Sequence, residues 1–241
     1  MSTLPDTAFV LAAGLGTRMR PLTDQRPKPL VPVAGKALLD HVLDRIAAAG
    51  VRRAVINVHY MADQIEAHVA SRAEPQIAIS DERGLLLETG GGVRKALPML
   101  GVLPFLVHNS DSIWLEHGVQ NLARLFAAFD AGRMDALLLL ADRSTSLGYS
   151  GRGDFELLAD GGVRRPQPGA SVQFAFTGVS MASPHLMRET PDGAFSLNRV
   201  WDRAIGEGRL AAITLDGVWM HVGDPAAVAA AERCIADAAG R

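Results

Sequence analysis

The chain has 241 residues, 48% of them hydrophobic and 21% charged, an ordinary composition for an enzyme with one large α/β domain and a substantial core. Its formal net charge of −2 argues against nucleic acid or an anionic membrane as the principal partner. The single cysteine, Cys234, excludes an internal disulfide, and neither a secretory signal nor an apolar run of the ~20 residues of a membrane helix is visible, so we expect a cytoplasmic protein.

The amino-terminal segment predicts a buried strand followed by a ligand-binding loop. The apolar run Ala8–Ala13 is short, continuous and ended by glycine, as in a strand covered on both faces. Gly14 and Gly16 then allow backbone torsions closed to other residues and let main-chain N–H groups approach a ligand. A hydroxyl and three positive charges follow, on Thr17, Arg18, Arg20 and Lys28, the last of these between two prolines. Such a loop suits a polyphosphate, although Gly-x-Gly alone fits a plain tight turn equally well.

Residues 38–80 alternate between helical and strand patterns. Apolar residues at helical spacing predict a helix over Leu38–Ile46, which Gly50 ends. A strand over Arg53–Val58, a helix over Ala62–Ala70 and a strand over Gln76–Ser80 follow. Because strand–helix alternation builds a parallel sheet with helices on both faces, we expect that architecture here.

A second glycine cluster lies in Glu88–Leu97, which reads Glu-Thr-Gly-Gly-Gly-Val-Arg-Lys-Ala-Leu. It runs into a helical pattern, so its glycines are expected to expose backbone donors near a helix start, a good place for an anion or a base edge. A flexible turn is the alternative interpretation.

The segment Pro104–Asp111 predicts a strand that ends in polar residues. Ligands gather beyond the carboxyl ends of the strands in open α/β sheets. We therefore expect Asn109 and Asp111 to face one cleft together with the glycine loop.

The pattern of predicted secondary structure changes after Asp142. Before this residue, we expect a helix over Gln120–Ala131 and a fully apolar strand over Ala136–Ala141. After it, Phe155–Leu158 and Val172–Met181 are separated by Gly, Pro and Asp, and predict strands of a mixed subregion.

Two further helices are expected near the carboxyl end. The first, over Leu197–Gly206, carries Asn198 and Asp202 on one face, and a solvated face is the default interpretation of that pair. A strand then leads into a final helix over Ala226–Ala238, for which Asp224 is the expected cap.

The strongest signal is the combined string around the first glycines. Residues 11–23 read Leu-Ala-Ala-Gly-x-Gly-Thr-Arg-Met-x-Pro-Leu-Thr, and residues 27–33 read Pro-Lys-Pro-Leu-Val-Pro-Val. This string closely resembles the signature of the sugar-1-phosphate nucleotidyltransferases. The resemblance implies a three-layer α/β/α sandwich with a mixed, mostly parallel central sheet. It also implies in-line attack of a sugar 1-phosphate on the α-phosphate of a nucleoside triphosphate, with release of pyrophosphate.

The resemblance also implies roles for individual residues. The catalytic residues would be Arg18, Lys28 and Asp111. The nucleotide would contact Ala13, Gly14, Gly16, Thr17, Arg18, Lys28, Glu88, Thr89, Gly90 and Gly91. The sugar phosphate would contact Asn109, Gly153, Asp154, Thr177, Gly178 and Asp202, although Gly151–Phe155 and Phe176–Val179 also fit plain hairpin turns. Mg²⁺, with Mn²⁺ as the alternative, would be held by Asp111 and His221.

His221 is a departure from the family pattern, which commonly places aspartate there as the second magnesium ligand. Magnesium prefers oxygen to imidazole nitrogen. His221 could therefore ligate the metal and favour Mn²⁺, could bind phosphate beside a metal held by Asp111 and water, or could mark a non-catalytic sensor of nucleotide sugars. We favour the first two together, because every other signature residue is present.

Shorter runs favour one branch of the family. Pro-Lys-Pro-Leu-Val-Pro-Val-Ala-Gly, Leu-Glu-Thr-Gly-Gly-Gly and Gly-Arg-Gly-Asp-Phe look most like the uridylyltransferases of cell-wall recycling that act on N-acetyl-α-muramate 1-phosphate. UTP would then be the nucleotide. Mannose- or heptose-1-phosphate guanylyltransferases and glucose-1-phosphate thymidylyltransferases remain alternatives.

We expect one domain over residues 1–241, with residues 1–115 mainly binding nucleotide and 116–241 mainly binding sugar phosphate, in a monomer or small homo-oligomer.

Overall fold

The computed structural model describes residues 4–240 and is built on a seven-stranded sheet in the order β12-β8-β11-β6-β1-β4-β5. Every strand runs parallel to the others except β11, which is antiparallel to both of its neighbours. The strand bounds are β1 Thr7–Leu11, β4 Arg53–Val58, β5 Gln76–Asp81, β6 Phe105–Asn109, β8 Ala136–Asp142, β11 Phe174–Ala182 and β12 Leu210–Thr214. The carboxyl ends of the six parallel strands therefore meet at one edge of the sheet.

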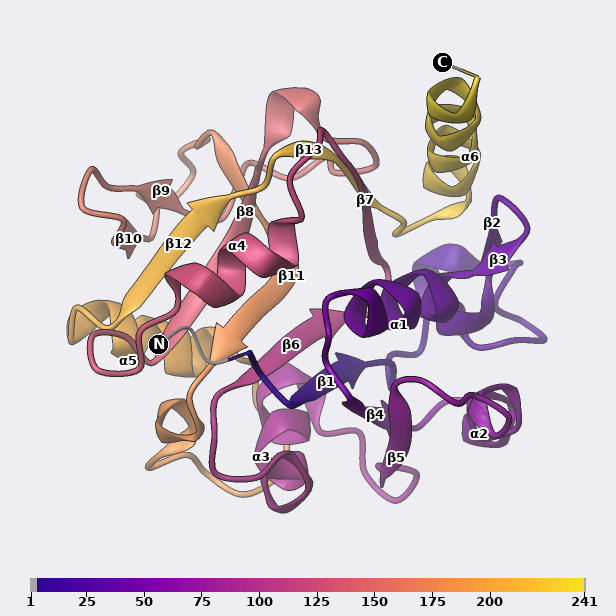
Figure 1. Cartoon of the computed structure of the whole chain (residues 1–241), viewed down its shortest axis with the longest axis horizontal. Coiled ribbons are helices and arrows are strands. Elements are labelled where there is room, and N and C mark those ends of the chain that lie inside the picture. Colours follow the sequence, from indigo (N-terminus) through magenta and orange to yellow (C-terminus); the bar gives the residue numbers. More distant parts are fainter. Residues whose placement is uncertain (1–3, 241) are drawn as a thin grey trace.

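Helices cover both faces of this sheet (Figure 1). Side chains alternate along β1, so Val10 packs with helices α1, α2 and α4 on one face, whereas Phe9 packs with α3 and α5 on the other. The helix bounds are α1 Leu38–Ala48, α2 Ala62–Val69, α3 Glu88–Leu100, α4 Asn121–Ala128, α5 Asn198–Gly206 and α6 Pro225–Ala239. The predicted three-layer α/β/α sandwich with a mixed, mostly parallel sheet is confirmed.

Smaller elements surround the carboxyl edge of the sheet. Strand β7 (Ser112–Glu116) pairs antiparallel with β13 (Gly217–His221), which brings two distant parts of the chain together. The remaining strands are β2 Pro32–Val33, β3 Lys36–Ala37, β9 Glu156–Leu157 and β10 Val163–Arg164, and the short 3-10 turns are η1 Thr17–Met19, η2 Lys28–Leu30, η3 Arg143–Thr145 and η4 Pro184–Met187.

Strands β7 and β12 were not predicted from the sequence. Strand β12 reads Leu-Ala-Ala-Ile-Thr, and alanine is a weak strand former, so the parallel partner β8 decides its conformation. Strand β7 pairs with β13, which lies more than one hundred residues further along the chain, as with Trp114 opposite Trp219. The predicted cap of the last helix is confirmed, since the Asp224 carboxylate accepts a hydrogen bond from the N–H of Ala227 at 2.8 Å.

No helix among residues 4–240 has the length and apolar character required to cross a membrane.

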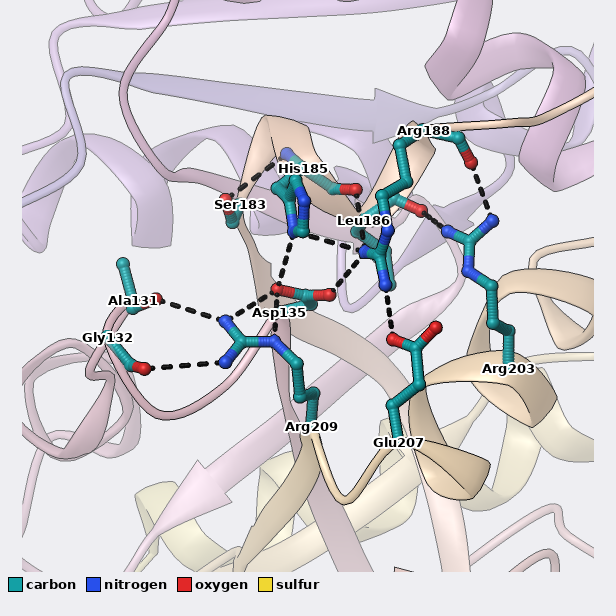
Figure 2. A network of polar contacts seen from close by, with 10 residues as sticks. All are labelled: Ala131, Gly132, Asp135, Ser183, His185, Leu186, Arg188, Arg203, Glu207 and Arg209. Carbon is teal, nitrogen blue, oxygen red and sulfur yellow. Dashed lines mark hydrogen bonds and ion pairs between the residues drawn. The ribbon is translucent and has the colours of Figure 1, made fainter.

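Ion pairs around Asp135 connect several elements at the amino-terminal ends of the parallel strands (Figure 2). Asp135 directly precedes β8. Its carboxylate accepts from Arg188 Nη1 at 2.7 Å and Arg209 Nε at 2.9 Å, and lies 3.2 Å from His185 Nδ1. Burial opposes ionisation of Asp135, but hydrogen bonds from Arg209, Arg188 and His185 outweigh it and lower its pKa to about 2. This network joins η4 and the start of β12 to β8, at the sheet edge opposite the predicted ligand site.

Candidate active site

A cavity of about 460 Å³ lies at the carboxyl edge of the sheet. Most of its wall comes from the carboxyl ends of β1, β4 and β6 and from the segments that follow β1, β5 and β6, as expected for an open α/β sheet. Its lining residues are Leu11, Ala12, Ala13, Gly14, Gly16, Thr17, Arg18, Lys28, Pro29, Asn57, Leu86, Glu88, Thr89, Asn109, Ser110, Asp111, Ser196 and Gly223. The structure thus gathers ten of the predicted site residues: Ala13, Gly14, Gly16, Thr17, Arg18, Lys28, Glu88, Thr89, Asn109 and Asp111.

The first glycine loop is held in one conformation by its own segment. Gly16 has φ +62°, a region that favours glycine, and a Cβ there would lie 3.0 Å from Lys28 Cβ. The Thr23 hydroxyl donates to the Gly16 carbonyl at 2.8 Å. Arg18 lies exposed on the cavity wall, and no ion-pair partner is found for its guanidinium among residues 4–240. The loop therefore presents backbone amides and a free positive charge, which suits a polyphosphate.

Lys28 and Asp111 form a direct ion pair at the cavity. Lys28 Nζ donates to Asp111 Oδ2 at 2.5 Å, and the two side chains are 14% and 17% exposed. Burial opposes ionisation of Asp111, but the nearby charges of Lys28 and His221 outweigh it, so the pKa of this carboxyl lies below its usual value. Asp111 is therefore a carboxylate at neutral pH.

His221 lies close enough to Asp111 for their charges to interact. The pairing of β13 with β7 brings it there, and the Val222 N–H donates to the Asp111 carbonyl at 3.1 Å. Burial lowers the pKa of the His221 imidazole, the charge of Asp111 opposes this, and the charges of Lys28 and Arg18 reinforce it. The ring is thus neutral at neutral pH and can offer a lone pair to a metal ion or accept a hydrogen bond.

The donor set around Asp111 fits a partly protein-held divalent cation. Among residues 4–240, no group of three or more His, Cys, Asp or Glu side chains is placed to hold a metal. Magnesium is usually bound by one or two carboxylates together with substrate phosphates and water, so a fully protein-made cage is not required. The Asp111 carboxylate supplies the hard oxygen, and His221 is the neighbouring nitrogen donor.

The second glycine cluster differs from its prediction. The amides of Gly90 and Gly91 donate to the Phe195 carbonyl at 2.8 and 3.0 Å, so they are not free for a nucleobase. A Cβ on Gly90 would lie 2.4 Å from the Phe195 ring, so close packing explains this glycine. Neither glycine lines the cavity, whereas Glu88 and Thr89 do, with Glu88 at φ +59°. The cluster begins helix α3. It joins this helix to the segment before α5, because the Thr89 hydroxyl accepts a hydrogen bond from the Leu197 N–H.

Among the predicted sugar-phosphate residues, Asn109 alone lines the cavity. Thr177 and Gly178 lie behind it in an irregularity of β11, where the Thr177 hydroxyl donates to the Leu139 carbonyl at 2.8 Å. Gly178 has φ +83°, and a Cβ there would lie 2.6 Å from Asn109 Nδ2. Gly178 therefore packs against Asn109, and Thr177 bonds to the neighbouring strand β8. Neither residue lines the cavity.

Gly178→Ala is expected to displace Asn109 and to lower stability by about 1–3 kcal/mol, since it adds both a steric clash and a strained left-handed φ. Gly101→Ala is the matched control, because Gly101 has φ +87° and open space around its Cβ position. Chemical denaturation of both variants separates the two contributions. An equal loss of stability in the two proteins would contradict the contact with Asn109.

The remaining predicted sugar-phosphate residues lie outside the cavity. Asp154 accepts from the Phe176 N–H at 2.8 Å and from the Tyr149 hydroxyl at 3.1 Å, and so ties its loop to β11. Gly153 has φ +89° and donates to the same hydroxyl at 3.2 Å. Asp202 is an exposed residue of α5 paired with Arg165 Nε at 2.8 Å. The structure does not bring these three residues to the cavity wall.

Sequence analysis missed several lining residues, including Asn57, Leu86, Ser196 and Gly223. Asn57 had a readable signal, because it is the one polar residue in the apolar run Ala54–Val58 near the end of a predicted parallel strand. Ser196 had no such signal. It lies next to Phe195, whose carbonyl bonds to the glycine cluster only in the folded chain.

His108 lies directly behind Asn109. Its ring is fully buried and stacks on Trp114 at 5.6 Å, and its Nδ1–H donates to the Asn109 carbonyl at 2.9 Å. Its Nε2 is buried and has no hydrogen-bond partner within the described residues 4–240. Burial lowers the pKa of His108 to about 4, with the Asn109 carbonyl opposing and Arg45 reinforcing this shift.

Because the folded pKa of His108 lies below the unfolded value near 6.5, stability is expected to be lost as pH falls through 6.5 toward 4. The His108 contribution between pH 7 and pH 5 is about 2 kcal/mol. Urea denaturation of the parent and of His108→Phe at both pH values gives the change in unfolding free energy between pH 7 and pH 5 for each protein. The difference between these two changes is the contribution of His108. An unchanged pH dependence in His108→Phe would exclude this residue as its source.

The fold and the cavity together define a class of protein. A mostly parallel α/β sheet carries at its carboxyl edge a glycine loop, two positively charged side chains and a partly buried carboxylate, a combination that suits an enzyme acting on nucleoside phosphates. Residues 7–151 match the nucleotidyl transferase family model, and the chain belongs to this family.

Similar proteins agree with this assignment. The chain is 51% identical to an N-acetylmuramate alpha-1-phosphate uridylyltransferase of Caulobacter vibrioides, over 99% of this chain and 100% of that protein. It is 36% identical to the Neisseria meningitidis protein of the same name, over 90% and 92%. The fold resembles that of a UDP-glucose pyrophosphorylase solved with UDP-glucose, with TM-score 0.75, 16% identity and coverage of 96% and 98%. The sequence-based identification as a sugar-1-phosphate nucleotidyltransferase is confirmed.

Proposed function

We propose that this enzyme joins UTP to N-acetyl-α-muramate 1-phosphate, forming UDP-N-acetylmuramate and pyrophosphate. The observation that carries the substrate choice is 51% identity, over the full length of both proteins, to a uridylyltransferase named for that sugar phosphate. A second relative of the same name, at 36% identity, supports it. The cavity agrees in chemistry, because its cations suit the triphosphate.

In this proposal the triphosphate lies along the first glycine loop. Backbone amides of Gly14 to Thr17 bind its phosphates, and Arg18 and Lys28 neutralise charge that develops on the leaving pyrophosphate. An oxygen of the sugar 1-phosphate attacks the α-phosphorus as the bond to pyrophosphate breaks. No covalent intermediate with the enzyme is needed, so its residues act by positioning and by charge neutralisation.

Asp111, with His221 beside it, would hold the Mg²⁺ or Mn²⁺ ion that members of this family generally use. Such an ion screens the charge of the attacked phosphate when it is bound. Lys28 keeps the Asp111 carboxylate ionised and fixed at the cavity in the free protein. Because Lys28 lines the cavity, the same ammonium group would donate to a phosphate oxygen when substrate binds.

Residues 116–241 form the acceptor side in this proposal. Ser196 and Gly223 line the cavity from this half of the chain. The loop of Gly153 and Asp154 and the irregularity at Thr177 and Gly178 act indirectly, through the support they give to β11. Asp202, which pairs with Arg165, is not assigned a contact with the acceptor.

The proposal is tested by incubating the protein with each of UTP, GTP, CTP and dTTP beside N-acetylmuramate 1-phosphate, mannose 1-phosphate and glucose 1-phosphate, with Mg²⁺ or Mn²⁺. Pyrophosphate release is expected to be fastest with UTP and the muramate. Faster release with GTP and mannose 1-phosphate would overturn the substrate choice and leave the reaction class intact.

A binding protein without catalysis is the second candidate, favoured only by His221 at the position of the usual aspartate. His221→Asp separates the two readings. Turnover by the parent chain supports the enzyme. A parent that binds UDP-sugar without turnover, and gains turnover in His221→Asp, would establish the sensor.

A further inference from the structure

We propose that Asn57 and Glu82 form a buried hydrogen-bond relay that fixes the first glycine loop relative to residues 86–89. Both side chains would act as positioning residues for the nucleoside triphosphate, so this inference rests on the proposed function. Their role is distinct from the phosphate-binding groups, since neither side chain carries a positive charge toward the cavity.

The relay is a continuous chain of three hydrogen bonds. Asn57 Oδ1 accepts from the Ala12 N–H at 2.7 Å, and Asn57 Nδ2 donates to Glu82 Oε1 at 2.8 Å. Glu82 Oε2 then accepts from the Leu87 N–H at 3.2 Å. The chain therefore connects the segment after β1, the end of β4, the residue after β5 and the residue before α3.

Burial makes each of these bonds costly to lose. Asn57 and Glu82 are each 1% exposed, so water does not replace a missing partner. The register of β1 with β4 ends where Leu11 lies opposite Asn57, so the Ala12 N–H is beyond the strand ladder and uses the Asn57 side chain instead. A buried N–H without an acceptor costs more than the bond itself contributes.

The relay also has little room to move. A Cβ on Gly92 would lie 2.9 Å from Glu82 Oε1 and 3.0 Å from Asn57 Nδ2, so the glycine of α3 is packed directly on the relay. The Glu82 backbone is held as well, because its carbonyl lies 2.7 Å from His59 Nδ1. The two side chains therefore keep a single arrangement.

Both ends of the relay border the cavity, which is why we assign a role in positioning. Ala12 and Asn57 line one wall, and Leu86, Glu88 and Thr89 line another. A triphosphate on the glycine loop places its base toward the second wall only if the two walls keep their separation. Loss of the relay should therefore weaken nucleotide binding in folded protein.

Single substitutions break the relay without removing side-chain volume. Glu82→Gln turns one carboxylate oxygen into an NH₂ group that faces another donor, either Asn57 Nδ2 or the Leu87 N–H. Asn57→Asp sets two acceptor oxygens against each other beside Glu82. Each variant is expected to raise KM for UTP about ten-fold or more, with a smaller change in KM for the sugar phosphate.

The double variant Asn57→Asp with Glu82→Gln is expected to restore the relay. The new carboxylate at position 57 still accepts from the Ala12 N–H, and its second oxygen accepts from the new NH₂ at position 82. The remaining oxygen at position 82 accepts from the Leu87 N–H. Every donor again has an acceptor, so KM for UTP should return to within about three-fold of the parent value.

Asp135→Asn is the matched control for stability alone. Asp135 is also a buried acid in a polar network, but it lies at the opposite edge of the sheet. This control should lower the melting temperature and leave KM for UTP unchanged. A rise in KM that follows melting temperature equally in all variants would show a merely structural role and overturn the proposal.

Two results distinguish this inference from the proposed function. If the parent turns over and neither single variant changes KM for UTP, or the double variant stays as impaired as the single ones, the relay is refuted and the function stands. If the parent lacks turnover, calorimetry with UTP and Mg²⁺ gives Kd for the same four proteins, and the same pattern is expected. No uptake of UTP by the parent would refute both.

Discussion

Asp111→Asn is expected to lower kcat by about 10²–10³-fold or more, the largest effect of any single substitution considered for this enzyme. The replacement keeps the size of the side chain and removes its negative charge. Asp111 lies two residues after the end of β6, forms a direct ion pair with Lys28 and lies close to His221. Without that charge, Lys28 loses its ion-pair partner, and a divalent ion held at this position would lose its anionic oxygen ligand. Steady-state pyrophosphate release with UTP and N-acetylmuramate 1-phosphate measures the change.

Asp216→Asn is the matched control, because Asp216 is a half-buried acid that does not line the cavity and lies 3.7 Å from His117. Its kcat should equal that of the parent. Circular dichroism and melting temperature establish that both variants are folded. Substantial turnover in folded Asp111→Asn would remove Asp111 from the catalytic group.

Lys28→Met is expected to lower kcat/KM for the triphosphate by about 10²-fold. It removes a positively charged ammonium group from the part of the cavity where we propose that the phosphates bind. The methionine chain fills much of the same space. In the parent, Lys28 is one of the charges that keep the pKa of Asp111 low, so this substitution also raises the pKa of that carboxyl.

The control for this substitution is Lys36→Met, since Lys36 is half-buried, pairs with Asp44 and does not line the cavity. The double variant Lys28→Met with Asp111→Asn adds a second check. Because the two side chains are in direct contact, their effects should be strongly non-additive. Additive losses would mean that the two groups act independently.

The sequence predicted most of the sheet because its strands carry local signals. Buried parallel strands such as β1 and β8 are continuous apolar runs, and glycine or polar residues mark their ends. Strand β12 has no such signal, and its conformation comes from pairing with β8. Likewise, β7 was not predicted, because its partner β13 lies more than one hundred residues further along the chain.

For the site, motif residues that follow a strand directly were placed well. Gly14, Gly16, Arg18 and Lys28 are close in sequence, so the local chain brings them to the cavity. The prediction for Gly90 and Gly91 failed in its physical detail, because the Phe195 carbonyl takes their amides. Sequence spacing does not show which distant carbonyl will lie against a glycine.

The sequence by itself determined the family, the mostly parallel α/β architecture and the glycine loop at the cavity, because each depends on residues close together in the chain. Only the tertiary structure decided that Lys28 pairs with Asp111, that His221 lies beside them, and that Asn57 joins Ala12 to Glu82. These contacts form between separate strands that meet at one sheet edge. Their geometry depends on burial and on hydrogen-bond partners that exist only once the chain has folded.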